Sequence, residues 1–369
     1  MVIAYFGADR ALLEADNAFT LNRRNMAVLY GLTQMKEVHV VINCIRTTRT
    51  RVIKELFKRD KEQSKYINYY IAPILPEKGD LRQLFRPINR FLLKCINLKT
   101  HRFLKKAKVI NWCYWPKAYY DWNYLKFEGK FVFDTDHNII EDPNISPEFR
   151  LNRKNELLTI GKKSDLILSS SRSMLLWYNK QGFNNTCLML NGVFSERINL
   201  ETRNIKGANY TVTYCGTLSK WIKSEWLIQL IQDHPHWQFN IIGANYKTEL
   251  SETLEAYSNV VLHGFLKPKA VSAILKQSDV AIGLYNENPA LDVNSMKLYD
   301  YLSQNIPVVI NKYHDYLNED FQSLVSTAVN YEEFKKMVAT PFVLSHQKIN
   351  HFLSQSLWDK RIQNVLEQL

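Results

Sequence analysis

The sequence predicts an α/β protein with two domains, each built on a doubly wound parallel sheet. Short apolar strands alternate with helical segments, as is typical of parallel sheets covered by helices on both faces. The alternation stops in a polar segment at residues 194–208 and restarts at Tyr210, with a glycine-ended strand like the one at residues 1–7. A chain of 369 residues is also long for one core and suits two.

The domain boundaries follow from that interruption. We expect an N-terminal domain over residues 1–193, a linker over 194–208 and a C-terminal domain over 209–345. The final segment, residues 346–369, is helical in pattern. The two halves share this architecture without a sequence repeat.

The first half contains apolar strands that are separated by helices and polar loops. His39 alternates with apolar neighbours and is interpreted as a core or strand-face histidine. The expected strands cover residues 1–7, 37–44, 66–72, 108–115, 130–137, 165–171 and 187–193, and the expected helices cover about 21–32, 118–125, 147–164 and 173–181.

Residues 81–108 form a basic segment with nine Lys or Arg and no acid. Four of these basic residues recur every four positions and would share one face of an amphipathic helix: Arg82, Arg86, Arg90 and Lys94. Pro87 either starts or kinks this helix. Two interpretations stay open: a crossover helix with a basic outer face, or a helix that docks on anionic lipid.

The second half repeats the alternation and contains the most informative stretch, residues 292–310. We expect strands at 210–216, 238–243, 260–264, 279–285 and 307–310, and helices near 224–233, 268–277 and 295–304. In the last helix, Asn294 or Ser295 would be the N-cap, Met296, Leu298, Tyr299 and Leu302 would face inward, and Asn305 would end it. A strand–loop–helix unit in a parallel sheet places its loop at the carboxyl edge, where ligands bind.

The residue types at this edge suit a nucleotide diphosphate sugar. The N-terminus of a helix at Ser295 offers unpaired N–H groups to an anion, and Lys297 lies in the same first turn. Gly216 and Thr217 end the first strand of this half, where a glycine lets the backbone approach a diphosphate. Asp300, about one turn further, suits sugar or ribose hydroxyls. On a lone helix Lys297 and Asp300 would be ordinary surface residues, but the combination favours a site.

Three motifs resemble those of GT-B glycosyltransferases, in particular bacterial enzymes that build teichuronic acids and exopolysaccharides. Residues 295–302 followed by 306–309 resemble their nucleotide-sugar-binding signature. Asp292 and Asp300, with seven residues between them, resemble the paired acids of the retaining family 4 enzymes, which usually carry Glu at both places. Residues 191–193 match their Pro-Asn-Gly-Val, although Leu190 replaces the proline. The resemblance covers residues 130–312, whereas the first 110 match only in layout.

This resemblance implies two Rossmann-like domains that face a cleft, with the C-terminal helix packed back on the first domain. The N-terminal domain would bind the acceptor and the C-terminal domain the donor, a UDP-type sugar, with no cofactor and no metal. The donor-binding residues that the signature and the neighbouring glycine turn imply are Gly216, Thr217, Asn294, Ser295, Met296, Lys297, Tyr299 and Asp300.

Three acids are candidates for the base that an inverting mechanism requires. Asp134 and Asp136 close a strand whose end should face the cleft, and Asp16 lies in the loop after the first strand. Asp134-Thr-Asp136 also spells DxD, the metal motif of the other large glycosyltransferase fold, but it lies far from the nucleotide site in sequence, so we reject a metal assignment. Asp136 could equally cap its loop, and a retaining enzyme would need no such base.

The charge and cysteine usage narrow the partners and the compartment. A net charge of +12 favours anionic partners, and without a nucleic-acid-binding motif these are nucleotide sugars, lipid-linked acceptors and the membrane surface. No apolar run approaches the roughly 20 residues of a spanning helix, and no signal peptide is evident. The five scattered cysteines suit a reducing compartment. We expect a cytoplasmic protein, peripheral at the inner membrane face through Arg82, Arg86, Arg90 and Lys94.

The sequence therefore predicts sugar transfer from a nucleotide diphosphate sugar to a lipid-linked or oligosaccharide acceptor in bacterial surface polysaccharide synthesis. Two alternatives stay open. One is a nucleotide-sugar 2-epimerase on the same fold, and the other is a non-catalytic GT-B-like subunit that supports a partner.

Overall fold

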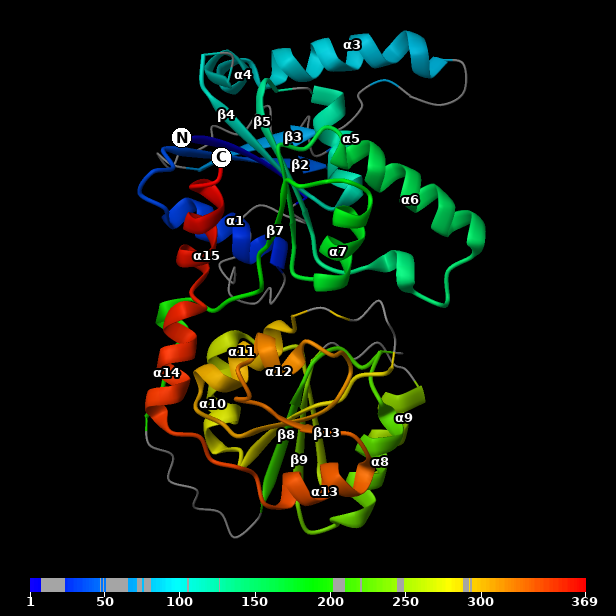
Figure 1. Cartoon of the computed structure of the whole chain (residues 1–369), viewed down its shortest axis with the longest axis vertical. Coiled ribbons are helices and arrows are strands. Elements are labelled where there is room, and N and C mark those ends of the chain that lie inside the picture. The colour runs from blue at the N-terminus through cyan, green and yellow to red at the C-terminus, as the bar shows by residue number, and fades with distance from the viewer. Residues whose placement is uncertain are drawn as a thin grey trace. The chain divides into compact units, whose positions relative to one another are not determined.

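The computed structural model contains two compact units, each built on one parallel sheet (Figure 1). Unit 1 comprises Met1–Asp136, Ile145–Met189 and Ile362–Leu369, and unit 2 comprises His137–Asn144 and Leu190–Arg361. The predicted α/β class with two Rossmann-like sheets is confirmed. The structure describes residues 1–7, 24–46, 48, 50, 66–71, 75, 81–104, 106–125, 127–201, 210–219, 221–243, 249–287, 292 and 294–369. The candidate Asp16 lies outside the described residues.

The sheet of unit 1 has seven strands in the order β3-β2-β1-β4-β5-β6-β7, and all neighbours are parallel. The order reverses between β1 and β4, which is therefore the topological switch point of this sheet. All five residues of β1 are buried, as expected for a central strand covered on both faces. The strands are β1 (Val2–Phe6), β2 (Val40–Arg46), β3 (Tyr66–Ile71), β4 (Val109–Tyr114), β5 (Gly129–Thr135), β6 (Leu166–Ser169) and β7 (Thr186–Leu188).

Local capping signals explain several helix starts in unit 1. Ser146 and Ser171 accept hydrogen bonds from the backbone N–H groups of Phe149 and Met174, both at 3.1 Å, and so begin α6 and α7. His39 is exposed just before β2, and its Nδ1 lies 2.7 Å from the N-terminal amine. The interpretation of His39 as a core or strand-face residue was therefore wrong. The helices are α1 (Arg24–Gln34), α3 (Leu81–Ile96), α4 (Leu98–Leu104), α5 (Trp115–Leu125), α6 (Pro147–Gly161) and α7 (Arg172–Lys180).

The basic segment forms two helices, α3 and α4, which are separated at Asn97, and Pro87 lies inside α3. The expected basic face is not simply exposed. Arg90 Nη2 donates to the backbone O of Asn123 at 3.1 Å, and the guanidinium of Arg90 lies 5.3 Å from the ring centroid of Tyr124. Arg86 lies 5.7 Å from the same ring. Two of the four expected membrane-facing residues therefore pack against α5.

The sheet of unit 2 has six strands in the order β10-β9-β8-β11-β12-β13, again all parallel. Its switch point lies between β8 and β11. Side chains of β11 alternate between two cores. Ala281 packs with residues of α11 (Met296–Ser303) and α14 (His346–Gln355), while Val280 and Ile282 pack with residues of α8 (Ser224–Asp233) and α13 (Tyr331–Ala339). The strands are β8 (Thr211–Cys215), β9 (Gln238–Ile242), β10 (Val260–Gly264), β11 (Val280–Gly283), β12 (Val308–Asn311) and β13 (Ser326–Ala328).

The helices of unit 2 include three that were not predicted: α9, α12 and α13. The expected C-terminal helix is interrupted near Ser356 and forms α14 and α15, and Ile362–Leu369 at the end of α15 groups with unit 1. The helices are α8 (Ser224–Asp233), α9 (Glu249–Glu255), α10 (Pro268–Gln277), α11 (Met296–Ser303), α12 (Leu317–Asp320), α13 (Tyr331–Ala339), α14 (His346–Gln355) and α15 (Trp358–Leu366).

Candidate functional site

The candidate site lies at the switch point of the unit 2 sheet. Strands β8 and β11 are parallel neighbours, so the segments that follow them lie at the same carboxyl edge. Gly216 follows β8, and the loop after β11 leads to Ser295 and helix α11. In doubly wound sheets, the crevice at such a point is where ligands bind.

Two glycines allow the backbone and a lysine to approach closely at this edge. A Cβ atom on Gly216 would lie 2.8 Å from Lys297 Nζ and 2.8 Å from the Tyr214 hydroxyl. A Cβ atom on Gly243, which follows β9, would lie 2.0 Å from the backbone O of Gly216. Neither position has room for a side chain, which explains why both strands end in glycine.

The ammonium group of Lys297 lies between two tyrosine rings. Its Nζ is 4.7 Å from the ring centroid of Tyr214 and 4.8 Å from that of Tyr285, and 3.4 Å from the Tyr214 hydroxyl. No carboxylate in the described part of the chain forms an ion pair with Lys297; nearby Asp300 pairs with Arg197 instead. Burial lowers the pKa of Lys297 from 10.5 to about 8. A cation in this setting, attracted by aromatic faces but not neutralised, suits an anionic ligand.

The first turn of α11 lies beside this lysine. Ser295 is the N-cap, as predicted, but its side chain caps no backbone N–H and instead accepts a hydrogen bond from the Tyr285 hydroxyl at 2.9 Å. The first N–H groups of a helix have no partner within the helix, so they can bind an anion. Tyr285 is itself fixed, because its backbone N and O each bond to the Asn311 side chain at 2.7 Å and its ring stacks on Tyr313.

Asp300 lies one turn further along α11 and keeps part of its surface exposed. Arg197 Nη1 lies 3.4 Å from Asp300 Oδ1, and the exposed fractions of the two side chains are 19% and 24%. Gln304 Nε2 donates to the backbone O of Arg197 at 2.8 Å and so holds the arginine in place. The second acid of the expected pair, Asp292, is only 8% exposed. Asp300 is therefore the better placed of the two to accept hydrogen bonds from hydroxyls.

Two residues expected to bind the donor lie in the interior of unit 2. Asn294 and Tyr299 are fully buried, and Asn294 Oδ1 accepts hydrogen bonds from the Tyr299 hydroxyl at 2.8 Å and from the backbone N of Asn191 at 2.9 Å. They position the start of α11 from beneath, so the expectation of direct contact with the donor is corrected. Met296 is half-buried, and Thr217 is exposed next to Gly216.

The expectation that Asp134 faces a cleft is also corrected. Its carboxylate is fully buried, accepts hydrogen bonds from Arg24 Nε at 2.9 Å and Trp112 Nε1 at 3.2 Å, and is closed off from substrate. Burial raises the pKa of Asp134, and Arg24 opposes that shift. The sequence could not show that the end of β5 is covered on both faces.

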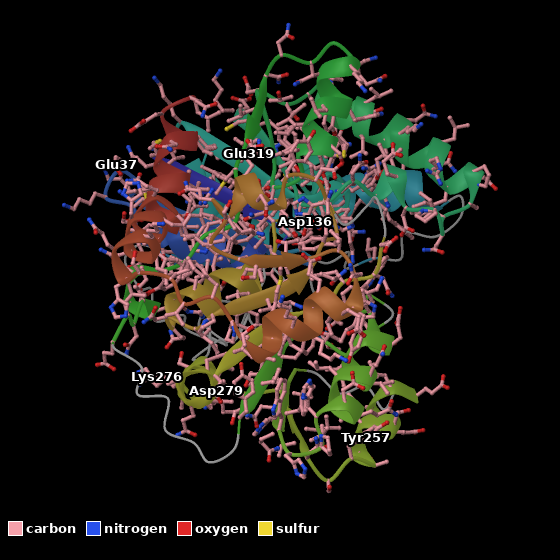
Figure 2. All side chains as sticks on the ribbon, turned by 60° about the horizontal axis from the view of Figure 1, so that its bottom comes forward. Glu37, Asp136, Tyr257, Lys276, Asp279 and Glu319 are labelled. Atoms are coloured by element: carbon pink, nitrogen blue, oxygen red, sulfur yellow. The ribbon has the colours of Figure 1, made fainter. Side chains whose placement is uncertain are left out.

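Asp136 remains a candidate base. Because β5 ends at Thr135, strand alternation no longer fixes the direction of the Asp136 side chain. Asp136, labelled in Figure 2, is partly exposed. Its Oδ2 accepts a hydrogen bond from the Tyr114 hydroxyl. Burial, together with the charge and hydrogen bond of Asp136, raises the pKa of Tyr114, which therefore stays a donor to the Asp136 carboxylate.

The described residues contain neither a metal-binding cluster nor a membrane-spanning helix. No group of three or more His, Cys, Asp or Glu residues there lies in an arrangement that could hold a metal ion. None of the helices in the described ranges has both the length and the apolarity that crossing a bilayer requires.

Four residues of the site were missed from the sequence: Tyr214, Tyr285, Arg197 and Gly243. Tyr214 precedes Gly216 by two positions in the same strand, and alternation could have placed both on one face. Gly243 ends a strand in the same way as Gly216, which was a usable signal. The contact between Arg197 and Asp300 joins positions 103 residues apart and left no local pattern.

Comparison with known proteins supports the expected resemblance. Residues 220–367 match a family model described as "Glycosyl transferase-like". A search of curated protein sequences gave no significant match. Among solved structures, the chain is similar to the lipopolysaccharide outer core galactosyltransferase WaaB, with 13% identity, a TM-score of 0.60 and coverage of 100% of this chain and 99% of that one.

Two further structures have the same fold along their whole length. HepE from Anabaena, in complex with UDP and glucose, has 13% identity, a TM-score of 0.64 and full coverage of both chains. Sucrose-phosphate synthase from Thermosynechococcus elongatus has 11% identity, a TM-score of 0.65 and coverage of 100% of this chain and 98% of that one. The chain thus has the GT-B glycosyltransferase fold, and its C-terminal part matches the glycosyl transferase-like family.

Proposed function

We propose that the protein transfers a sugar from a nucleotide diphosphate sugar, of the UDP type, to a lipid-linked or oligosaccharide acceptor in bacterial surface polysaccharide synthesis. One observation carries this proposal: the ammonium group of Lys297 has no carboxylate partner in the described part of the chain. It lies next to Gly216 and the N-terminus of α11, at the switch point of the unit 2 sheet. The match to the glycosyl transferase-like family and the UDP and glucose held by HepE, which has the same fold, support it.

The groups at this edge have distinct roles in the proposed reaction. Negative charge develops on the diphosphate as the bond to the sugar breaks, and Lys297 with the N–H groups of α11 stabilises it. Gly216 lets the diphosphate lie against the backbone after β8. Asp300 accepts hydrogen bonds from ribose or sugar hydroxyls. Because Lys297 and the helix supply positive charge at the leaving group, we propose that transfer needs no metal.

The acceptor and the location form the second part of the proposal. A net charge of +12 suits an acceptor that carries phosphate and a location at the anionic inner face of the cell membrane. If the reaction inverts, Asp136 is the candidate among the described residues to take the proton of the acceptor hydroxyl.

Calorimetry with UDP tests the donor site. Lys297→Ala should weaken UDP binding by the ~1.5–3 kcal/mol of a charged hydrogen bond, which is about 10- to 150-fold. Lys276→Ala is the matched control, because Lys276 lies at the end of α10 and pairs with Glu201 away from the switch point (Figure 2). Equal UDP affinity in the two variants would remove Lys297 from the site.

A transfer assay tests the reaction itself. Radiolabelled sugar from a panel of nucleotide sugars should pass to a membrane fraction, and Lys297→Ala should slow that passage. Release of an epimerised nucleotide sugar without transfer would instead identify an epimerase. UDP binding without any reaction, in the presence of membranes, would point to a non-catalytic subunit. Loss of activity with EDTA and its recovery with manganese would overturn metal independence.

A further inference from the structure

Helix α3 presents large apolar side chains to solvent. Leu84 is 61%, Ile88 41% and Phe91 65% exposed, and their spacing of four and three residues places them on one side of the helix. We call these three residues the α3 apolar face. Cys95 is also exposed, one turn beyond Phe91. Helix α4 continues the exposed apolar surface with Leu98 and Phe103, at 43% and 41%.

The opposite side of α3 is anchored in unit 1, which fixes the direction of the apolar face. Leu93 and Asn89 are fully buried, and the Asn89 side chain bonds to the backbone N and O of Leu75 at 2.7 and 3.0 Å. Arg90 bonds to α5 through the backbone O of Asn123. In Figure 1, α3 lies along the margin of unit 1 as a nearly straight cyan helix. Rotation of α3 to hide its apolar face would break these contacts.

The charge of residues 81–108 indicates what kind of partner binds the α3 apolar face. Residues 81–108 carry nine Lys or Arg and no acid, so every charged side chain that this segment itself contributes is basic. Among the described basic side chains, Arg102, Lys106 and Lys108 are exposed, and Lys94 is half-buried with a long side chain that can extend along the helix. Apolar side chains flanked by basic ones are the pattern of a helix that lies in the interface of an anionic membrane. Contact with another protein would not require the absence of every acid.

We propose that the α3 apolar face inserts into the acyl boundary of an anionic bilayer, while flanking basic residues contact lipid phosphates. This inference specifies how the protein would bind the membrane proposed above: the contact is an apolar face of α3 and not a stripe of charge. The sequence indicated a stripe of charge from Arg82 to Lys94, but two of those residues pack on α5, and the outward side is apolar. The inference concerns α3 and does not depend on the donor site, so the two fail separately.

Vesicle binding of the full chain tests the proposal. Wild-type protein should float with vesicles of phosphatidylcholine mixed with phosphatidylglycerol, and weakly with phosphatidylcholine alone. Replacing two apolar side chains in Leu84→Ser/Phe91→Ser should lower the partition coefficient by about tenfold or more, because each removes apolar area from the bilayer. The matched control is Phe342→Ser/Val343→Ser, since both residues are 68% exposed and lie in unit 2. The control should float like wild type.

Insertion can be separated from surface attraction with a label on the exposed Cys95. An environment-sensitive fluorophore there should shift to shorter wavelength on anionic vesicles, because Cys95 lies one turn beyond Phe91. A circular dichroism spectrum and a thermal unfolding midpoint equal to those of wild type show that the α3 variant is folded. Equal flotation of wild type and α3 variant, or no spectral shift at Cys95, would overturn insertion. So would a change of oligomeric state in the α3 variant with unaltered vesicle binding, which would make the face a contact between copies of the chain.

Discussion

The two switch points of the molecule share a topology and differ in how they handle charge. In unit 1, Gly7 follows the central strand β1, and in unit 2, Gly216 follows the central strand β8. Near the unit 1 point, Arg24 and Asp134 neutralise each other in the interior. At the unit 2 point, Lys297 has no carboxylate partner in the described chain.

The difference shows that topology alone does not make a binding site. A doubly wound sheet places polar groups at its carboxyl edge in both units. In unit 1 Arg24 and Asp134 are buried and pair with each other, so the Asp134 carboxylate is neutralised within the protein and is not exposed to a ligand. In unit 2 no described carboxylate pairs with Lys297, and the proposed function assigns its charge to the diphosphate of the donor.

The largest expected effect is on turnover and concerns Asp136. Unlike Asp134, Asp136 is not buried in an ion pair with Arg24. If Asp136 is the base, Asp136→Asn should lower turnover by a factor of roughly 10² to 10⁴ while donor affinity stays intact. Transfer rate and UDP affinity are measured separately. Near-normal turnover would mean that the base is Asp16, or that the enzyme is retaining and needs none.

A second expected effect concerns stability and tests the buried Arg24–Asp134 pair of unit 1. Asp134→Ala leaves the buried Arg24 guanidinium without its carboxylate, and should lower the free energy of unfolding by about 3–5 kcal/mol. Urea denaturation followed by circular dichroism measures this. The double variant Arg24→Met/Asp134→Leu removes both charges and should recover part of the loss. A stable Asp134→Ala protein that has lost only turnover would instead make Asp134 catalytic.

The smallest expected effect is a pH dependence at unit 2. Because burial lowers the pKa of Lys297 to about 8, its side chain carries a positive charge below that pH and loses this charge above it. UDP affinity should therefore be constant near neutral pH and fall about tenfold per unit as pH rises above 8, until the higher pKa of the complex is reached. Calorimetry across this range measures the slope. Lys297→Arg stays charged and should bind with no such slope; the same slope in that variant would assign it to another group.

Local signals explain what the sequence predicted well. Helix α8, strand β10 and helix α10 begin and end where they were expected, and the last of these has Pro268 at its first turn. The N-cap of α11 was narrowed to Asn294 or Ser295 because capping residues are visible within a few positions, and the structure places it at Ser295. Lys297 and Gly216 were placed at one edge by topology, and the structure brings them into contact.

Contacts between distant residues explain what could not be predicted. Tyr214 and Lys297 are 83 residues apart, so the aromatic surroundings and the lowered pKa of the lysine have no local signature. Asp134 was expected to face a substrate because alternation shows only which side a strand residue takes, and not whether that side is covered. Which side of α3 faces solvent could not be predicted either, because it is determined by contacts with α5 and Leu75 that only the folded chain shows.

The way the chain divides between the units has a consequence for biosynthesis. Unit 1 takes in Ile362–Leu369, where Ile362, Val365 and Leu366 are buried, and all of unit 2 precedes that segment in the chain. During translation, unit 1 cannot complete its core until unit 2 has left the ribosome, although all seven strands of its sheet were made first. A nascent chain therefore carries an unfinished apolar surface on unit 1 for the whole time that unit 2 is being synthesised, and a chaperone or a pause in translation would act in that interval.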